Sequence, residues 1–395
     1  MYECNFSKEL VTILSQPFFY DSFKLVIIPQ INSDGKNFEV FQEGNQIEVI
    51  CYKSTLISIF KENHKFIEKY LPDLNFNTIV GNTTKVNYID FYNVTVGLLL
   101  TTAENKTNFN LHSDVFFIIW NNIKYEDEKF EFLLKETFII QRLLTCSLNK
   151  INKSSSLYIW YRKLFILWQH IHNQHYNKNI EKLIFNSKIF IQSGKQHFAN
   201  YYCWNTAKWI FDNLNSLTLK QAYFNDIKLY CLQNISDSSS WDCLSYMVCQ
   251  HKLRNNHHRT DFDRLAKHLP ILEQLSTRNV VCFQPNLISL TQELISYISK
   301  CEIKMWPPYL CLLRILKVYN VELNNLRLEL IDKWTKSIKT FESKNGQIQL
   351  LHNFIPIVSL PKDNNSDLNN DFIMKETLLH LGYKKVFLNN LINHK

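Results

Sequence analysis

SSSLYIWYRKLFIL at residues 154–167 and NYYCWNTAKWIF at residues 200–211 are the two stretches that decide the fold. In each, a short polar turn leads into a run whose first tryptophan is Trp160 or Trp204. Apolar residues then recur at the i, i+3 and i+4 spacing of an amphipathic helix, so each run predicts a helix that follows a turn. The two tryptophans are 44 residues apart, which indicates a repeated unit.

The same pattern occurs on both sides of this pair, in SDVFFIIW at 113–120 and in SDSSSWDCLSYMV at 236–248. The first is again 44 residues from its neighbour, counted from aromatic to aromatic, and the second is 37 residues away. A helical hairpin has one apolar face that it cannot bury alone, so hairpins stack and a large aromatic residue fills the space between them. We therefore predict an all-α protein, a right-handed α-α superhelix of stacked helical hairpins, with a repeat core of Phe116, Trp160, Trp204, Trp209 and Trp241.

Composition agrees with a helical chain that has a sizeable core. Only 7 Gly and 9 Pro occur in 395 residues, whereas sheet proteins need frequent Gly-rich turns. Hydrophobic residues make up 46% of the chain, too many for a disordered protein. We expect an N-terminal segment at 1–53, where the alternation in 24–51 suggests a short hairpin, a hairpin array at 54–320, and C-terminal helices and a tail at 321–395, including a helix over 321–341.

The net charge of +8 and the pI near 8.8 are mild for this length, and we interpret the basic residues as scattered. This pattern does not indicate a nucleic-acid partner, although a basic surface also suits an anionic substrate or an acidic protein. The basic stretch 251–260 predicts an exposed loop in which His257 and His258 are solvated.

Ten cysteines lie far apart and form no C-x-x-C pair, so we predict no metal site and reduced, buried thiols. The N-terminus has acidic residues where a signal peptide would be basic and then apolar. No apolar run is long enough to cross a membrane, since the best candidate covers only 92–101. We expect a cytoplasmic protein that is not inserted into a membrane.

The local sequence motifs resemble those of the protein prenyltransferase α-subunit repeat family. Asn200, Tyr201, Trp204 and Trp209 reproduce its N-Y-x-x-W-x-x-x-x-W form, and the 154–163 and 236–241 segments resemble two further variants. Three residues after the leading aromatic, where the family has an arginine that ties neighbouring hairpins together, this chain has Lys163, Ala207 and Leu244. We therefore expect its hairpins to rely more on apolar packing.

The resemblance implies the α-type subunit of a heterodimeric protein geranylgeranyltransferase, which is not catalytic alone. The implied partners are a β subunit that carries the zinc, a protein with a C-terminal cysteine, and an isoprenyl diphosphate at the interface. No cofactor and no catalytic residue are expected in this chain. The implied substrate-binding or partner-binding residues are Lys153, Tyr158, Asn200, Tyr201 and Tyr202.

Two other hypotheses stay open. A helical-repeat scaffold for protein–protein interaction would bury the tyrosines at 158, 201 and 202 between hairpins, whereas the subunit would present them on a shared face. A helical array that binds nucleic acid would need Lys and Arg aligned along one groove.

Overall fold

The structure is a computed structural model, and it describes residues 4–16, 22–29, 35–70, 87–175, 185–253, 257–269, 281–352, 355–356 and 368–392. The described part is mostly helical. The chain forms two compact units, which are described separately below. Unit 1 comprises Met1–Asn215 and His257–Val280, and unit 2 comprises Ser216–Asn256 and Val281–Lys395.

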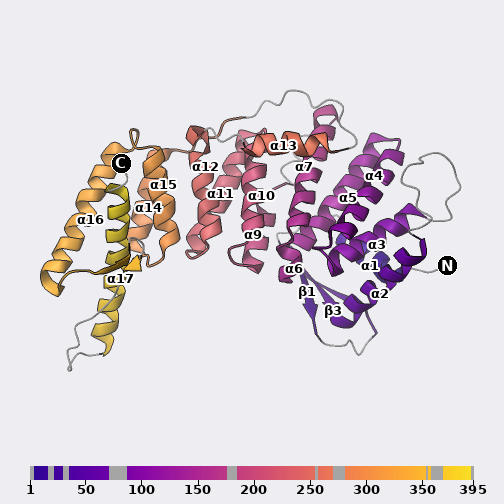
Figure 1. The fold of residues 1–395 in the computed structure, drawn as a ribbon, viewed down its shortest axis with the longest axis horizontal. Helices are drawn as coiled ribbons and strands as arrows, with labels where there is room; N and C mark the ends of the chain where they lie inside the picture. The colour runs from indigo at the N-terminus through magenta and orange to yellow at the C-terminus, as the bar shows by residue number, and fades with distance from the viewer. Residues whose placement is uncertain are drawn as a thin grey trace. The chain divides into compact units, whose positions relative to one another are not determined.

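Unit 1 contains helices and a small sheet (Figure 1). Its elements are α1 (Asn5–Leu14), β1 (Ser22–Ile28), β2 (Phe38–Glu43), β3 (Gln46–Tyr52), α2 (Lys53–Tyr70), α3 (Tyr88–Thr101), α4 (Lys106–Asn122), α5 (Glu126–Leu144), α6 (Asn149–Asn152), α7 (Ser155–His175), α9 (Lys188–Gln196), α10 (Tyr201–Asn213) and α13 (His257–Lys267).

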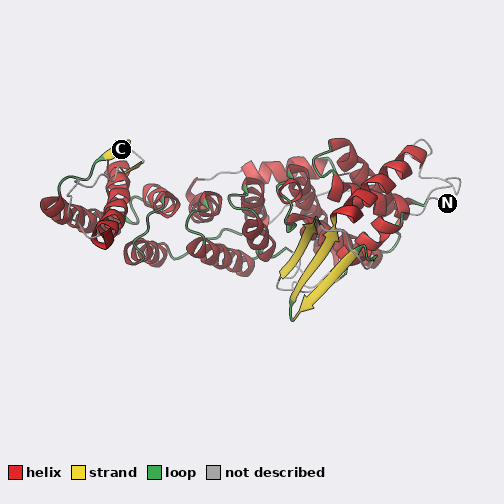
Figure 2. Ribbon diagram, turned by 90° about the horizontal axis from the view of Figure 1, so that it is seen from below, coloured by secondary structure: helices red, strands yellow, loops and turns green. Residues whose placement is uncertain are grey.

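The sheet departs from the all-helical expectation and lies in the stretch whose alternation predicted extended structure. Its strand order is β1-β3-β2, with β1 parallel and β2 antiparallel to β3 (Figure 2). Gly44 has a φ of 56° and occupies the first position of the two-residue turn between β2 and β3, as in a type II′ hairpin. The Leu25 carbonyl of β1 accepts a hydrogen bond from the Ser147 amide at 3.0 Å, which fixes the sheet next to the end of α5.

Helix α3 forms the centre of the N-terminal part of unit 1. Its residues 91–100 are all buried, as expected for a helix that is apolar on every side. It lies close to α1 and α2 because Gly97 has no side chain. A Cβ at this position would lie 2.3 Å from Asn63 Nδ2 and 2.7 Å from Ser7 Oγ. The longest apolar run of the sequence is therefore part of a protein core.

The helical hairpins are joined by polar contacts as well as by apolar packing. Arg162 of α7 donates to Thr206 Oγ1 of α10 at 3.2 Å, lies 3.5 Å from Asp261 of α13, and stacks over the Trp209 ring. Gln169 of α7 also donates to the Asn213 carbonyl at 2.8 Å. Unit 1 thus keeps an interhelical arginine at the position before Lys163, and its polar contacts add to the apolar packing that was expected between hairpins.

The predicted loop at 251–260 is also largely helical. Helix α12 continues to Leu253 and α13 begins at His257, with 254–256 outside the described residues. His258 Nδ1 lies 2.7 Å from Asp212 Oδ2, so this histidine is paired rather than solvated. Phe262 stacks on Trp209 with ring centroids 5.6 Å apart. These two contacts shield one face of α13 from solvent, which the polar sequence of 251–260 does not predict.

Unit 2 is a set of packed helices with a short two-stranded sheet. Its elements are α11 (Leu217–Gln233), α12 (Ser238–Leu253), α14 (Leu287–Lys300), α15 (Trp306–Val318), α16 (Asn324–Asn345), β4 (Leu350–His352), β5 (Ile355–Pro356) and α17 (Leu368–Ile392). Trp334 of α16 lies at the centre of an aromatic cluster, with Phe387 of α17 at 5.1 Å and Tyr309 of α15 at 6.0 Å between ring centroids. The helix expected over 321–341 is present as α16.

Two predictions for the chain concern the state of its cysteines and the ability of its helices to span a membrane. None of the ten cysteines forms a disulfide bond, and all are buried except Cys282 and Cys301. Among the helices that the structure describes, none has the length and apolar character needed to span a bilayer.

Candidate functional site

The five residues predicted to bind a substrate or partner fall into two groups. Lys153, Tyr201 and Tyr202 are on the surface of unit 1. Tyr158 and Asn200 are buried. The structure therefore does not gather the five residues into one accessible site.

The buried pair belongs to a polar junction between helices. Asn200 caps α10 by accepting a hydrogen bond from the Cys203 amide at 3.3 Å, and its amide donates to Asn152 Oδ1 at 2.6 Å. The hydroxyl of Tyr158 lies 2.7 Å from Ser193 Oγ. Burial raises the pKa of Tyr158 well above its ordinary value, so the phenol stays neutral. These side chains satisfy one another and join α6, α7, α9 and α10.

The exposed tyrosines follow a turn of unusual backbone geometry. Ala199 has a φ of 52°, in the left-handed region that residues with a Cβ seldom adopt. This conformation lets Asn200 enter the interior while its neighbours remain outside. Phe198 is 54% exposed, Tyr201 63% and Tyr202 44%, and the two tyrosine rings pack edge to face with centroids 5.6 Å apart. Three large aromatic side chains thus face solvent within five residues.

Lysines border these aromatic residues. Lys150, Lys153 and Lys195 are exposed at the facing ends of α6 and α9. Burial lowers the pKa of His197, whereas the hydrogen bond to the Ser147 carbonyl raises it. The charge of Lys153 lowers this pKa further, so Lys153 lies close to His197 and to the turn. We call the following set the basic aromatic surface: Lys150, Lys153, Lys195, Phe198, Tyr201 and Tyr202.

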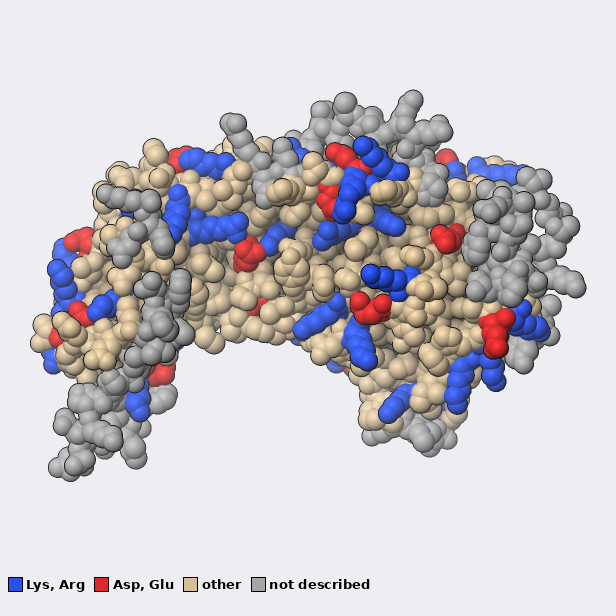
Figure 3. Space-filling view, in the orientation of Figure 1, with Lys and Arg blue, Asp and Glu red and all other residues tan. Residues whose placement is uncertain are grey.

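Sequence reasoning missed that this surface lies in a stretch of the chain with almost no acidic residues. Residues 145–211 contain nine Lys and Arg but one acidic residue, Glu181, a net charge of +8 that equals that of the whole chain. The nine basic residues are spread over the stretch, in keeping with the interpretation of the basic residues as scattered, and the feature that was missed is the scarcity of acidic residues. Described parts of this stretch contain no carboxylate side chain, and Figure 3 shows Lys and Arg side chains over the region of α6 and α9.

A second polar cluster links a threonine, a histidine and a glutamate in a chain that is closed to solvent. Thr95 Oγ1 lies 2.9 Å from His112 Nδ1, and His112 Nε2 lies 2.8 Å from Glu136 Oε1. Glu136 also accepts hydrogen bonds from Tyr92 at 2.5 Å and from the Trp160 indole at 2.6 Å. All five side chains are buried, so a substrate has no access to the Thr95 hydroxyl and the cluster joins α3, α4, α5 and α7.

The charge of Glu136 is stabilised within this cluster. Burial alone would raise its pKa, but the charge of His112 and the hydrogen bonds from His112, Tyr92 and Trp160 hold the pKa below its ordinary value. The carboxylate is thus an ionised acceptor that orients Trp160.

The residues predicted as repeat core are all buried, namely Phe116, Trp160, Trp204, Trp209 and Trp241.

The described residues hold no group of three or more His, Cys, Asp or Glu side chains arranged to bind a metal ion. The expected lack of a cofactor in this chain stays a prediction.

Comparison with known proteins assigns the chain to a family. Three family models match it: the ECM9 N-terminal domain at residues 2–145, the ECM9 middle domain at 157–269 and the ECM9 C-terminal domain at 288–395. Protein ECM9 of Saccharomyces cerevisiae is 35% identical over 380 residues, which cover 95% of this chain and 92% of the yeast protein.

These matches contradict the functional prediction. They concern ECM9 domains from end to end, and none describes a prenyltransferase. The assignment to the prenyltransferase α-subunit repeat family is wrong, as are the geranylgeranyltransferase activity, the zinc-carrying β subunit and the prenylated substrate that followed from it. The physical reason is that N-Y-x-x-W describes a helix cap followed by a core tryptophan, which Asn200 and Trp204 are, and such a motif identifies a hairpin rather than a reaction. The chain belongs to the ECM9 family.

Proposed function

We propose that this protein binds an acidic segment of another protein on its basic aromatic surface. The observation that carries the proposal is the combination of three exposed aromatic side chains with three lysines, in a stretch that carries the entire net charge of the chain. Exposed aromatic residues are enriched at protein interfaces because they bury a large area at a low cost in side-chain entropy.

Charge favours an acidic partner. Lys150, Lys153 and Lys195 have no ion pair within the described part of the chain, whereas Arg162 faces Asp261 and Lys163 faces Asp114. The unpaired lysines would attract a negatively charged segment over a long range, and the aromatic residues would then hold its apolar side chains.

A protein segment fits better than a nucleic acid. Base stacking requires free ring faces, but Tyr201 and Tyr202 pack against each other, so one ring face is already covered. Three lysines on one edge also neutralise few phosphates, whereas sequence-independent binding of nucleic acid depends on many such contacts.

Two further features are part of this proposal. The 44-residue offset of the Arg162–Thr206 and Gln169–Asn213 hydrogen bonds supports stacked hairpins of superhelical type in unit 1. The absence of disulfide bonds among the ten cysteines supports a cytoplasmic location, where thiols remain reduced.

A peptide array tests the binding role. The purified full chain is applied to short peptides that vary independently in acidic and in apolar content, with oligouridine in a parallel measurement. We expect binding only to peptides that are both acidic and apolar. The double variant Tyr201→Ser, Tyr202→Ser should weaken binding at least about tenfold, because two interface aromatic residues are lost.

The double variant Val321→Ser, Leu328→Ser is the matched control, since it removes exposed apolar side chains from unit 2. Binding that does not depend on acidic residues, or oligouridine that binds more tightly than any peptide, would exclude the proposed partner.

A further inference from the structure

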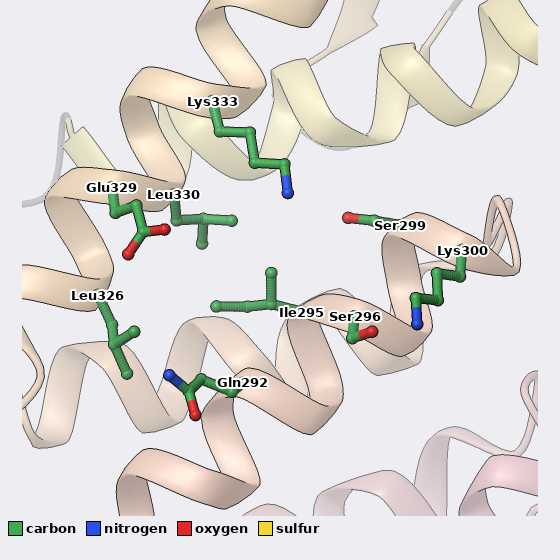
Figure 4. Close-up of a pocket in the computed structure, with 9 residues that line it drawn as sticks. All are labelled: Gln292, Ile295, Ser296, Ser299, Lys300, Leu326, Glu329, Leu330 and Lys333. Carbon is green, nitrogen blue, oxygen red and sulfur yellow. The ribbon is translucent and has the colours of Figure 1, made fainter.

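The groove between α14 and α16 of unit 2 shows no preference for a ligand. Lys300, Glu329 and Lys333 line it, but their charged groups lie apart and do not converge on one point (Figure 4). Such charges fix neither the sign nor the shape of an occupant. The outer edge of the sheet in unit 1 is more specific, because its backbone groups, apolar side chains and charges each restrict what would bind there.

Strand β2 is an edge strand with free hydrogen-bonding groups on its outer side. Among the described strands it pairs only with β3. Glu43 precedes the two-residue turn into β3, so the alternation of an antiparallel pair directs the backbone groups of Glu43, Phe41 and Glu39 to β3. Val40 and Gln42 direct their amides and carbonyls outward, where the described residues offer them no hydrogen-bond partner.

This edge lacks the features that usually prevent a strand from pairing with other chains. Exposed edge strands are commonly protected by lysine, by proline or by a bulge. The sequence of β2, FEVFQE, contains neither lysine nor proline, and its register with β3 runs without a bulge. Figure 2 shows the sheet extending away from the helices of unit 1. Such a strand is suited to accept another strand along its outer side.

One face of an added strand would continue an apolar row of the sheet. Leu25 of β1 and Val49 of β3 are adjacent in the register and fully buried, and Val40 of β2 is next in this row. Val40 is 49% exposed, because the row ends at the edge strand. An apolar residue of an added strand would lie beside Val40 and remove its side chain from water.

The other face of β2 is acidic around an exposed aromatic ring. Phe41 is 53% exposed and lies between Glu39 and Glu43 on this face. Glu39 accepts a hydrogen bond from the Tyr52 hydroxyl, but neither glutamate forms an ion pair within the described residues. Lysine or arginine side chains on this face of an added strand would pair with the two carboxylates.

We propose that the outer edge of β2 binds an extended segment of a partner protein in which apolar and basic residues alternate. The alternation follows from the pleat, since neighbouring side chains of a strand point to opposite faces of a sheet. The apolar side chains lie beside Val40, and the basic side chains face Glu39 and Glu43. The segment joins the sheet as a further strand, held by the outward backbone groups of Val40 and Gln42.

A second copy of this chain fits the edge less well than a basic segment. In the antiparallel register that aligns the two Phe41 residues, Glu39 of each copy would lie opposite Glu43 of the other. Like charges directly opposite each other destabilise a pair of strands. A basic segment avoids this repulsion, and its charge also distinguishes it from the acidic partner proposed for the basic aromatic surface.

Fluorescence anisotropy with a labelled peptide tests this binding on the full chain. The peptide alternates valine and lysine, and a peptide of the same composition, with valines and lysines in separate blocks, is the comparison ligand. The alternating peptide should bind at least about tenfold more tightly, because only this peptide can place all its valines on one face and all its lysines on the other.

Two N-methylated isomers of the alternating peptide test the backbone hydrogen bonds. One isomer carries methyl groups on the valine amides and the other on the lysine amides. Alternate amides of a strand point to opposite sides, so only one set faces β2. One isomer should therefore lose binding and the other should keep it, although their side chains are the same.

Val40→Pro should weaken binding of the alternating peptide at least about tenfold. The proline removes an outward amide but no hydrogen bond to β3, as at other edge positions that tolerate proline. Val40→Thr is the matched control. It keeps the amide and the branched shape, so its affinity should stay within about threefold of the native chain. Amide hydrogen exchange in β3 verifies that the hairpin of each variant remains paired.

Glu43→Lys should weaken binding of the alternating peptide by about threefold or more, because a pair of opposite charges becomes a pair of like charges.

Three results would overturn the proposal. The first is equal affinity for the alternating and the block peptide, and the second is equal affinity for the two N-methylated isomers. The third is a dimer of the native chain, seen by sedimentation, that Val40→Pro dissociates, because this result would assign the edge to a second copy.

Discussion

Asn200 is a residue at which a sequence motif identified structure rather than binding. The motif led us to predict Asn200 and Tyr158 as contacts for a ligand, but both are buried in the junction of α6, α7, α9 and α10. Their neighbours Tyr201 and Tyr202 are exposed in the first turn of α10, and Ala199 just before this turn adopts a left-handed conformation. Sequence periodicity does not reveal such a conformation at an alanine, so the division between buried and exposed residues could not be predicted.

Gly97→Ala should destabilise unit 1. The new Cβ would lie under 3.0 Å from atoms of both α1 and α2, so the helices must move apart. Overpacking of this kind costs about 1–3 kcal/mol in the free energy of unfolding, which denaturant titration measures. The exposed variant Glu104→Ala should change it by less than about 0.5 kcal/mol. An alanine at 97 that leaves stability unaltered would show that α3 does not pack this closely.

Glu136→Gln should make the free energy of unfolding fall less steeply as the pH drops below about 4.5. Since the pKa of Glu136 is below its ordinary value of 4.5 in the folded state, its contribution is complete above about pH 4.5 and is lost as the pH falls through the folded-state pKa. The free energy of unfolding of the native chain should therefore fall more steeply below this pH than that of the variant. At neutral pH the variant should be less stable by about 1–3 kcal/mol, because it leaves buried donors poorly matched.

Denaturant titrations at several pH values provide the comparison, with Glu104→Gln as an exposed control. Identical acid dependence in the native chain and Glu136→Gln would contradict the ionised state of this carboxylate.

At the scale of helices, the sequence predicted elements better than it predicted their contacts. The apolar spacing located the cores of α4, α7, α10 and α12, because a helix that buries one face must repeat apolar residues about every 3.6 positions. It failed for α13, whose sequence is polar and whose helical state depends on Trp209 and Asp212. Such a helix is specified by residues about 50 positions away, which a local pattern does not include.

Arg162→Met should release α13 from its contacts with α7. The variant keeps the apolar stem over Trp209 but removes the ion pair with Asp261 and the hydrogen bonds to Thr206. Because Arg162 is largely shielded from solvent, we expect a loss of about 1 kcal/mol in local stability, seen as faster amide hydrogen exchange in α13. Exchange in α3 should stay the same, which serves as the internal control. Unchanged protection of α13 would mean that Phe262 and the His258–Asp212 pair hold this helix without Arg162.

At the scale of the whole molecule, the two units have separate cores. Trp334→Ala should remove the centre of the aromatic cluster in unit 2 and destabilise that unit by about 3–5 kcal/mol. Hydrogen exchange should accelerate in α14 to α17 while α3, α4 and α5 keep their protection. An equal loss of protection in both units would contradict the division into separate cores.

The sequence revealed the candidate site in unit 1 only in part. The basic aromatic surface could be anticipated in part, since the motif pointed to Tyr201 and Tyr202 and the acid-poor stretch 145–211 is visible in the sequence.

Site-specific photo-crosslinking in cells tests the central claim most directly. A photoreactive amino acid replaces Phe198 in the basic aromatic surface, or Val321, which is 78% exposed in unit 2, as the control. We predict adducts at 198 that mass spectrometry assigns to an acidic segment of a protein, and that disappear when Lys150, Lys153 and Lys195 are changed to Glu. Adducts to nucleic acid at 198, or the same adducts at 198 and 321, would contradict the claim that this surface binds an acidic protein segment.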